Sequence, residues 1–334
     1  MVQFLAYTEL TLKGKIISES PALNIVIISY NGCKLTEQCI NSLMDTTLMT
    51  DYIITVVDNA STDDTEEVIK QKFPQVRFIS NSQNLGYAKA VNIGVKSYDT
   101  EFALVVNNDV IFHKELVDNL LKFISENKNI GVAGVRQFYP DGTIQYSYGD
   151  PPGALTGLKN LLFINSLRNF FAEHSKKKNN KIIEVGYVDG AALMIRREVF
   201  DVLNGFDEDY FFYTEEADFC YRLRKNNWSV VFNPSLAITH LRGSTTAHSF
   251  PNEQQIKMLV DSKFLFCRKH LSKIETIFYT ICELENNSIL YAITAVTSIF
   301  LKDEKLSKAK AKLDFHKYNI KYLLRSKNTK VPLG

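Results

Sequence analysis

The sequence predicts an α/β fold in which a mostly parallel sheet carries helices on both faces, followed by a helical C-terminal extension. Apolar runs of strand length alternate with segments of helical spacing from residue 24 onward. The connections between these segments are short, which is typical of strand–helix units in a parallel sheet. From about residue 246 the pattern is helical.

Each expected strand of the first half is an apolar run. The runs are NIVIISY (24–30), YIITVVD (52–58), VRFISN (76–81), EFALVVNND (101–109) and NIGVAGV (129–135). Within the fourth run, residues 102–106 are apolar throughout, which is typical of a strand buried on both faces.

Helices are expected between these strands, at 34–45, 61–73, 86–97 and 114–127. In the first of them, apolar residues recur at helical spacing at Leu35, Cys39, Ile40 and Leu43. The second begins at Ser61, its expected N-cap, and has acidic residues in its first turn, which the helix dipole favours.

The chain after residue 135 is less regular. Turn signals and aromatic residues mark 139–153, and strand character returns in 228–244. These changes predict three parts, namely an N-terminal extension at 1–23, an α/β domain at 24–245 and a basic helical region at 246–334.

Composition restricts the class of protein. The chain has 334 residues, 45% of them hydrophobic, and a net charge of +2, which argues against a nucleic-acid binder. Its five cysteines include no CxxC pair, so we expect neither a zinc site nor a disulfide framework, and a reducing compartment fits. We find no signal-peptide pattern and no apolar run long enough to span a membrane. The expected location is therefore the cytoplasm, with a peripheral position on the cytoplasmic face of the inner membrane as the alternative.

Polar residues follow four successive strands. They are Ser29, Tyr30 and Asn31 after the first, Asp58 after the second, Asn84 and Gly86 after the third, and Asn107, Asn108 and Asp109 after the fourth. Asn and Asp bond readily to nearby backbone, so a turn explains each group taken singly. Open α/β sheets, however, bind ligands outside the carboxyl ends of their strands. The recurrence favours a shared cleft over four independent turns.

The sequence has neither a GxGxxG nor a GxxxxGK[ST] phosphate loop. A nucleotide bound here therefore needs another device. Asp58 could accept a hydrogen bond from a pyrimidine N–H. A divalent cation on Asp109 could neutralise a diphosphate, since Mg²⁺ and Mn²⁺ choose oxygen ligands and leave positions for substrate phosphates.

A second polar cluster lies in FFYTEEADFCYR (211–222), where Glu215, Glu216 and Asp218 stand among aromatic residues. Carboxylates in apolar surroundings have raised pKa values, which suits a general base. The alternative is an ordinary acidic helix start, which the helix dipole also favours.

Six stretches carry a family resemblance. They are IVIISYNG, VVDNASTDDT, NLGYAKAVNIG, VVNNDV, VDGAALMIRREVFDVLNGFDEDYFFYTEEADFCYRLRKNNW and THLRGST, in this order, within about two thirds of the chain at 24–245. Together they resemble the family-2 inverting glycosyltransferases of the Rossmann-like GT-A fold, and most closely the bacterial rhamnosyltransferase-like branch.

The resemblance implies a nucleotide-sugar site, in which Asp58 reads the pyrimidine base and Asp189 and Gly190 line the sugar pocket. The full set of implied donor-binding residues is Ser29, Tyr30, Asn31, Asp58, Asn84, Gly86, Lys89, Asn107, Asn108, Asp189, Gly190 and Arg242. For Lys89 and Arg242 an ordinary surface position is the alternative.

The resemblance also implies a site for Mg²⁺ or Mn²⁺, in which Asp109 binds the cation that bridges the donor diphosphate and His240 completes the site. The chain departs from the family's DxD motif because its first carboxylate is replaced by Asn107. A single carboxylate at this motif predicts modest metal affinity.

Glu215 and Glu216 match the family's acidic catalytic pair. We expect Glu216 to deprotonate the acceptor hydroxyl, with Glu215 as the alternative base, so that the acceptor oxygen displaces the nucleoside diphosphate in one inverting step. Glu216 stands where Asp is usual and is one methylene longer. A misplacement of about 1 Å can cost on the order of 10²-fold in rate.

Substrate identity follows from the resemblance alone. It favours dTDP-L-rhamnose as donor, with UDP-sugars next, and a saccharide or lipid-linked acceptor in the synthesis of a bacterial surface polysaccharide such as lipopolysaccharide or capsule.

Two other classes of protein stay open. A sugar-phosphate nucleotidyltransferase would need a glycine-rich basic loop after the first strand, where this chain has SYNGCKLTEQ. A catalytically degenerate scaffold protein would bind the sugar nucleotide without transfer.

The C-terminal region has two interpretations. Ser288–Leu301 is an uncharged apolar run of 14 residues, and 302–330 holds ten Lys or Arg against three Asp or Glu. Residues 286–334 could therefore lie in a membrane interface with the lysines on anionic headgroups. The alternative is a helix packed on the catalytic domain or in a homodimer interface.

Overall fold

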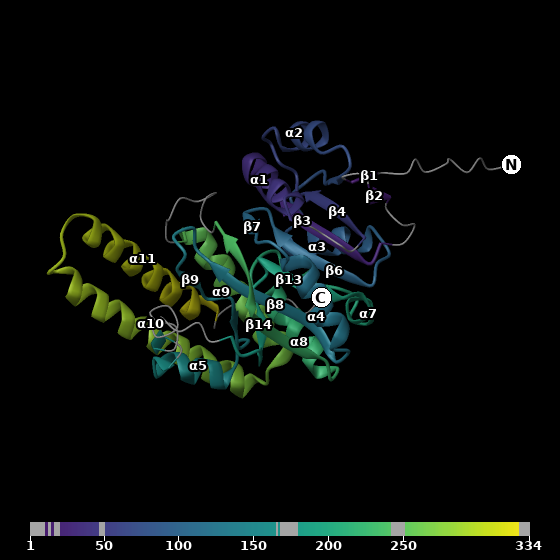
Figure 1. The fold of residues 1–334 in the computed structure, drawn as a ribbon. Helices are drawn as coiled ribbons and strands as arrows, with labels where there is room; N and C mark the ends of the chain where they lie inside the picture. The colour runs from purple at the N-terminus through teal and green to yellow at the C-terminus, as the bar shows by residue number, and fades with distance from the viewer. Residues whose placement is uncertain are drawn as a thin grey trace.

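The structure of the protein is a computed structural model that describes residues 11–12, 15–16, 21–46, 51–164, 166–167, 180–241 and 251–326. Figure 1 shows a body built around one twisted sheet, with a pair of long C-terminal helices projecting from it. From the expected N-terminal extension, two short strands are described, β1 (Thr11–Leu12) and β2 (Lys15–Ile16), which pair antiparallel.

The central sheet has the strand order β11-β14-β8-β13-β6-β3-β4-β5 among the described residues. Their bounds are β3 (Leu23–Ser29), β4 (Tyr52–Asp58), β5 (Arg77–Ser80), β6 (Phe102–Asn107), β8 (Ile130–Phe138), β11 (Ile183–Glu184), β13 (Ala192–Arg196) and β14 (Ser229–His240). β3, β4, β5 and β6 run parallel, and β14 runs parallel to β8. The predicted parallel sheet is confirmed, with β13 inserted antiparallel between β6 and β8.

Four shorter strands frame the edge of the sheet. β7 (Val110–Phe112) pairs with β14, and β9 (Ile144–Gln145) pairs with β8. β10 (Tyr148–Gly149) and β12 (Tyr187–Val188) form a separate antiparallel pair. The β7 pairing brings His240 beside Val110, just after the carboxyl end of β6.

Both faces of the sheet are covered, as predicted. On one face, β3 contributes Ile25 and Ile27 to a core with α1 (Cys33–Met44), α2 (Thr65–Lys72) and α4 (Leu116–Glu126). On the other, Val26 and Ile28 join a core with α3 (Tyr87–Lys96), α7 (Arg197–Val202) and α8 (Glu215–Lys225). The continuous apolar run of β3 follows from this arrangement, because alternate side chains enter opposite cores.

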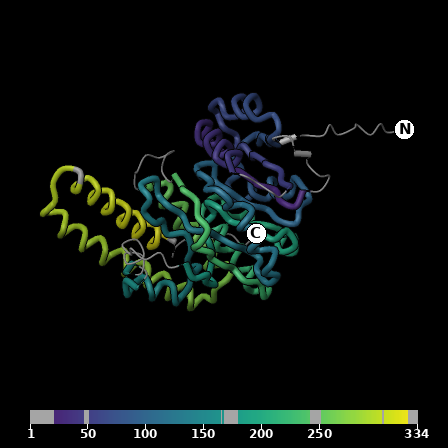
Figure 2. Tube along the Cα trace, in the orientation of Figure 1, coloured from purple at the N-terminus to yellow at the C-terminus, as the bar shows by residue number. Residues whose placement is uncertain are grey.

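The C-terminal part is helical, as predicted. It consists of α9 (Glu253–His270), α10 (Lys273–Ser298) and α11 (Asp303–Ser326). α9 and α10 each begin with a capping box, Asn252 with Gln255 and Ser272 with Glu275, which fixes where each helix starts. Figure 2 shows α10 and α11 as two antiparallel arms of one hairpin, and α5 (Ala154–Leu161) packs beside α10.

One local prediction is wrong. Ser61 was expected to cap a helix over 61–73, but α2 begins at Thr65 after Asp64. The Ser61 hydroxyl instead donates to the carboxylate of Asp58. A carboxylate three residues upstream competes for the same hydroxyl, so the chain forms a loop before the helix starts.

Helix length and polarity bear on the membrane question. Among the described residues, none of the helices has a stretch apolar and long enough to traverse a bilayer.

Candidate active site

The carboxyl ends of β3, β4 and β6 meet at one edge of the sheet. Ser29 lies opposite Asp58 in the parallel register, and Ile28 lies opposite Asn107. The N–H of Asn59 donates to the Ser29 carbonyl at 2.8 Å, which joins the two strand ends. The structure therefore brings the polar residues of these strand ends together, because parallel neighbours in register finish at the same level.

The Asp58 carboxylate is fixed by the loop that follows it. Asp58 is 2% exposed, and its Oδ2 accepts the N–H of Ser61 at 3.0 Å while Oδ1 accepts the Ser61 hydroxyl. Asn31 extends this contact, because its N–H donates to Ser61 Oγ at 2.8 Å and its Oδ1 accepts the N–H of Thr62 at 2.8 Å. The loops after β3 and β4 thus form one hydrogen-bonded unit.

Ser29 and Asn108 both contact Thr36 on α1. The buried Ser29 hydroxyl lies 2.8 Å from Thr36 Oγ1, and Asn108 Nδ2 donates to the same oxygen at 3.1 Å. These two side chains therefore join strand ends to α1. Tyr30, by contrast, is 49% exposed.

Asn59 is the centre of the next loop, and the sequence analysis assigned it no role. Its Nδ2 donates to Asn84 Oδ1 at 2.9 Å and to the Gly86 carbonyl at 3.2 Å. Its Oδ1 accepts from Asn81 Nδ2 at 3.2 Å and from the N–H of Leu85 at 3.0 Å. One buried amide thus shapes the whole segment 81–86, which carries two predicted donor-binding residues.

Gly86 joins this loop to the segment before the acidic pair. Its φ is +83°, and a Cβ would lie 2.5 Å from the carbonyl oxygen of Phe211. The next residue, Tyr87, donates its N–H to that carbonyl at 2.7 Å. Glycine is required here because both the left-handed backbone and the close approach exclude a side chain.

Asp109 and His240 face each other across β7 and β14. His240 Nε2 lies 3.2 Å from Asp109 Oδ1. Its Nδ1 lies 3.1 Å from the amide oxygens of Gln137 and Gln145, which accept but do not donate. Nδ1 therefore carries the proton, and in the neutral ring Nε2 presents a lone pair beside the Asp109 carboxylate.

Tyr87 links the predicted sugar pocket to the predicted catalytic residues. Its hydroxyl donates to the Gly190 carbonyl at 2.9 Å. Burial raises the pKa of Tyr87, and the charges of Glu215, Glu216, Asp189 and Asp109 raise this pKa further. Carboxylates from distant parts of the sequence therefore act electrostatically on one phenol. In the sequence, Tyr87 directly follows Gly86, a predicted donor-binding residue, and this adjacency was the one available signal for its position. No periodicity identifies its contact with Gly190.

Asp189 belongs to the same network as the Asp109–His240 pair. Its Oδ1 accepts from Gln137 Nε2 at 3.2 Å and from the N–H of Ala191 at 3.0 Å. Gln137 thus connects Asp189 to His240, so the predicted sugar-pocket residue and the predicted metal ligand are held by one amide.

The two residues of the acidic pair differ in environment. Glu215 is 4% exposed, and its Oε2 has no hydrogen-bond partner within the described part of the chain. Burial raises the pKa of Glu215, and the charges of Glu216 and Asp189 raise it further. Glu216, the next residue on α8, is partly exposed. The structure thus distinguishes a buried carboxyl that favours its neutral form from an accessible one beside it.

The backbone before this pair is strained. Tyr213 and Thr214 have φ of +72° and +69°, in the left-handed region that glycine prefers. For a β-branched residue such as Thr214 this is an outlier, and each such residue costs about 1–2 kcal/mol. Strain of this kind concentrates at functional sites and persists only when the surrounding structure holds it in place.

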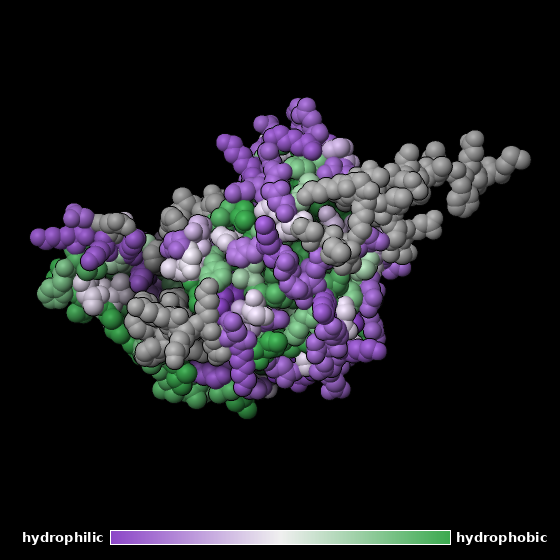
Figure 3. Space-filling model, in the orientation of Figure 1, coloured by the Kyte–Doolittle hydropathy of each residue, from purple (hydrophilic) through white to green (hydrophobic). Residues whose placement is uncertain are grey.

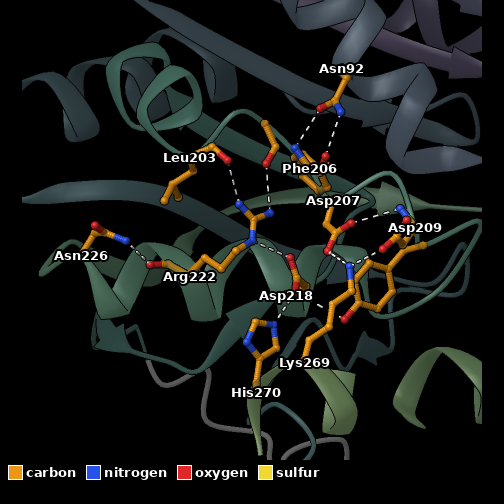
Figure 4. A network of polar contacts seen from close by, with 12 residues as sticks. Asn92, Leu203, Phe206, Asp207, Asp209, Asp218, Arg222, Asn226, Lys269 and His270 are labelled. Atoms are coloured by element: carbon orange, nitrogen blue, oxygen red, sulfur yellow. Dashed lines mark hydrogen bonds and ion pairs between the residues drawn. The ribbon is translucent and has the colours of Figure 1, made fainter. Parts of the chain in front are cut away.

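A polar network holds α8 in position (Figure 4). Asp218, fully buried, accepts from Arg222 Nε at 2.7 Å and lies 2.6 Å from His270 Nε2 at the end of α9. Arg222 also donates to the carbonyls of Leu203 and Gly205, each at 3.0 Å. The buried Asp218 carboxylate is paired on both sides, and this network locks the helix that carries Glu216.

A second part of the network anchors the preceding loop. Lys269 binds Asp209 at 2.5 Å and also binds Asp207 (Figure 4). Asn92 of α3 donates to the Phe206 carbonyl and accepts its N–H, both at 2.8 Å. The loop before the acidic pair is therefore held from α3 and from α9.

The remaining predicted donor-binding residues make few contacts with the other predicted site residues, or lie outside the described part of the chain. Asn107 ends β6, and its N–H donates to the Ala191 carbonyl at 3.1 Å. Lys89 is 43% exposed and lies 4.0 Å from Glu208, so it sits on the surface of α3 with a distant partner. Arg242 lies outside the described residues.

Comparison with known proteins gives the family. The family model for glycosyl transferase family 2 matches residues 24–203, which contain the strand ends, the donor loop and Asp189. The chain belongs to glycosyl transferase family 2. The predicted glycosyltransferase class and GT-A fold are thereby confirmed, and the nucleotidyltransferase alternative is wrong.

Two curated relatives extend the comparison of this glycosyltransferase. The N-acetylglucosaminyl-diphospho-decaprenol L-rhamnosyltransferase of Mycobacterium tuberculosis is 30% identical over 240 residues, covering 67% of this chain and 77% of that protein. The low-salt glycan biosynthesis hexosyltransferase Agl10 of Haloferax volcanii is 26% identical over 212 residues, covering 62% of this chain and 63% of that protein.

Two solved structures share the fold. The mannosyltransferase PcManGT from Pyrobaculum calidifontis, in complex with GDP-Man and Mn²⁺, superposes with a TM-score of 0.60 at 14% identity, over 94% of this chain and 89% of that one. GalNAc-T7 with UDP, GalNAc and Mn²⁺ superposes with a TM-score of 0.52 at 15% identity, over 71% of this chain and 48% of that one. Both likenesses concern the fold.

Proposed function

We propose that this glycosyltransferase moves a sugar, with inversion, from a nucleoside diphosphate donor to an acceptor hydroxyl. The nucleotide lies at the strand ends around Asp58, and the sugar lies near Asp189 and Gly190. The observation that carries the proposal is the contact network at this edge, in which Tyr87 donates to the Gly190 carbonyl and Gln137 joins Asp189 to His240. The charges of Glu215 and Glu216 also raise the pKa of Tyr87, so donor-side and acid–base groups act on one region.

Glu216 is the proposed general base. Its neighbour Glu215 is buried, and burial raises the pKa of Glu215, so Glu215 favours the neutral form. Glu216 is partly exposed on the first turn of α8 and is the carboxylate an acceptor can reach. It takes the proton from the acceptor hydroxyl as that oxygen attacks the anomeric carbon, and the nucleoside diphosphate leaves.

The residues at Asp109 fit a divalent cation, Mg²⁺ or Mn²⁺. The His240 lone pair and the Asp109 carboxylate face the same point, and two amide oxygens set the histidine tautomer. Among the described residues, no cluster of three or more His, Cys, Asp or Glu side chains could hold a metal ion, so substrate phosphate oxygens would have to supply the remaining ligands. When bound, the cation neutralises charge on the leaving diphosphate.

The donor and acceptor classes rest on the relatives. The rhamnosyltransferase is the curated relative with 30% identity, which favours dTDP-L-rhamnose as donor and a lipid-linked saccharide as acceptor, in surface polysaccharide synthesis. A UDP-sugar donor is the second candidate.

A thermal-shift panel tests the donor. dTDP-rhamnose, UDP-glucose, UDP-galactose, UDP-GlcNAc and GDP-mannose are each added with Mn²⁺, Mg²⁺ or EDTA. A donor at about 100 times its Kd stabilises the folded state by roughly 2.7 kcal/mol. We expect one donor to raise Tm only with metal. No shift with any donor contradicts the proposal, and a shift without transfer to any acceptor favours the scaffold alternative.

Membrane contact is proposed as a second property of the chain. α10 and α5 expose many apolar side chains, and Figure 3 shows apolar residues along the lower edge of the molecule. The most exposed residues of this apolar surface are Ile274 and Val296 on α10, Ile299 and Phe300 directly after α10, and Leu155 on α5. The surface begins at Ile274, twelve residues before the region expected from the sequence (286 − 274).

An anionic bilayer is the proposed occupant of this surface. α11, which packs on α10, exposes lysines 305, 310, 312 and 317, and Lys302 is exposed just before it. Basic residues beside an apolar helix favour anionic headgroups. We expect co-sedimentation with phosphatidylserine vesicles, lost in an Ile293→Ser, Val296→Ser, Phe300→Ser variant. Equal recovery of both proteins with the vesicles contradicts the proposal. A homodimer in solution that the same variant converts to monomer assigns the surface to a second copy.

A further inference from the structure

A groove of about 340 Å³ lies between α9 and the loop that precedes the acidic pair. Phe211 and Phe212 line it from the loop, and Met258, Leu265 and Arg268 line it from α9. The three α9 residues lie on one helical face, and ten residues of helix span about 15 Å at 1.5 Å each. The volume is within the range of small-molecule sites, and the donor-binding residues leave it unused.

The groove adjoins the proposed reaction centre. The Phe211 carbonyl accepts the N–H of Tyr87 at 2.7 Å, and the Phe212 ring packs edge-on to Tyr87 with centroids 6.2 Å apart. Tyr87 in turn donates to the carbonyl of Gly190, in the predicted sugar pocket, at 2.9 Å. The groove therefore shares its wall with a direct neighbour of Tyr87, and its two phenylalanines precede Glu215 and Glu216 by four residues in the chain.

The chemistry of the lining is amphiphilic. Phe211 is 49% exposed and Phe212 is 39% exposed, so two aromatic rings offer unburied apolar surface. The acidic lining residues are already paired, Asp209 with Lys269 at 2.5 Å and Asp261 with Lys257 at 2.6 Å.

Arg268 differs from these acidic residues. It is exposed, and within the described part of the chain it makes no ion pair. An unpaired guanidinium at the end of an apolar wall recognises a phosphate attached to an apolar group, since arginine binds phosphate through two parallel N–H donors.

We propose that this groove is the acceptor subsite, and that it takes an amphiphile whose apolar segment lies on Phe211, Phe212, Met258 and Leu265 and whose phosphate meets Arg268. The assignment to the acceptor rests on the proposed transferase function. The recognition of an apolar phosphate ester rests on the groove alone.

Calorimetry with geranyl diphosphate tests the subsite. The full chain is titrated in EDTA, so that a cation at Asp109 does not contribute, and below the critical micelle concentration of the probe. We expect saturable binding, at least tenfold tighter than that of inorganic pyrophosphate, geraniol or octyl glucoside. Octyl glucoside binding as tightly as geranyl diphosphate would overturn the phosphate assignment.

Variants locate the binding. Arg268→Gln and Phe212→Ser should each weaken geranyl diphosphate binding at least tenfold, and Leu265→Ala should weaken it in the same direction if Phe212→Ser does not fold. Lys122→Gln, which removes a positive charge from exposed α4, is the matched control and should leave binding unchanged. Unaltered affinity in both Arg268→Gln and Leu265→Ala overturns the proposal.

The donor panel separates this proposal from the proposed function. Arg268→Gln should keep the metal-dependent thermal shift of the wild type, because Arg268 is outside the donor residues. A wild type that binds geranyl diphosphate in the groove without any donor shift supports an amphiphile site and contradicts the transferase assignment. A metal-dependent donor shift without geranyl diphosphate binding supports the transferase assignment and contradicts the amphiphile site.

Discussion

The nucleotide side and the base side of the proposed site are built differently. On the nucleotide side, the buried Asp58 carboxylate accepts two hydrogen bonds from Ser61, and the Asn59 amide makes four contacts. On the base side, Glu215 Oε2 is buried without a partner among the described residues, directly after two positive φ angles. One side has its polar groups satisfied, and the other keeps a group that burial destabilises.

The difference indicates how the fold divides its tasks. A binding surface works when its polar groups are already oriented, whereas acid–base chemistry needs carboxyls whose pKa values differ. An unsatisfied buried polar group costs about 1–3 kcal/mol. The paired network of Asp218, Arg222 and His270 is what keeps the costly segment in place.

The largest expected effect is on the base side. Glu216→Gln should lower turnover by about 10²- to 10⁴-fold, the range for loss of a general base, and should leave donor binding unchanged. Release of nucleoside diphosphate, measured with the donor from the thermal-shift panel, gives the rate. If Glu216→Gln keeps wild-type turnover while Glu215→Gln abolishes it, the roles of the two residues are reversed.

The nucleotide side should lose stability when its central amide is removed. Asn59→Ala leaves the partners at 81–86 without their contacts, and we expect a loss of roughly 2 kcal/mol in the free energy of unfolding, measured in urea. Donor affinity should fall as well, because the loop carrying Asn84 is no longer shaped. Asn81→Ala breaks one of these contacts and should cost less than half as much. An equal loss of unfolding free energy in Asn59→Ala and Asn81→Ala would contradict the view that Asn59 organises the loop at 81–86.

The amide that joins Asp189 to His240 should tune metal affinity. Gln137→Leu removes one acceptor for His240 Nδ1, and loss of such a supporting contact weakens metal binding by about tenfold at the low end of its usual range. Mn²⁺ titration followed by electron paramagnetic resonance measures the affinity. Gln75→Leu, whose amide contacts Met44, is the control. An unchanged Mn²⁺ affinity in Gln137→Leu contradicts a cation at this pair.

Glu215 should make stability depend on pH. Burial raises its pKa above the ordinary value of 4.5 in the folded state, so above that pH the folded chain binds a proton that the unfolded chain releases. The free energy of unfolding then falls as pH rises from about 4.5 toward the raised pKa. Glu215→Gln cannot ionise and should therefore exceed the wild type in Tm at pH 8, with the gap closing toward pH 4. A gap that is constant with pH contradicts this, and exposed Glu126→Gln controls for the change of charge.

The smallest effect concerns backbone strain. Thr214→Asn should raise the free energy of unfolding by about 0.5 kcal/mol, because asparagine tolerates the left-handed region better than a β-branched residue. Chemical denaturation measures it, and Ala60→Asn on the nucleotide side, with φ of +66°, is the matched comparison. A loss of stability at Thr214 alone would show that its side chain contributes more than its strained backbone costs.

Much of the architecture was determined by the sequence. The unbroken apolar run at 102–106, within β6, predicted a strand buried on both faces, and its alternate side chains do enter two cores. The polar residues at strand ends predicted one edge, since neighbouring parallel strands finish together. Local chemistry and periodicity suffice for such features, as they depend on residues close in the chain.

The tertiary structure alone decided the rest. The pKa of Tyr87 is raised by carboxylates that lie between 22 and 129 residues away in the chain (109 − 87 and 216 − 87), and the groove joins residue 211 to residue 268. Ser61 turned from an expected helix cap into the partner of Asp58, and Glu215 separated from Glu216 by burial. Hydrogen-bond partners and burial are set by which distant segments pack together, and that packing leaves no periodic trace in the chain.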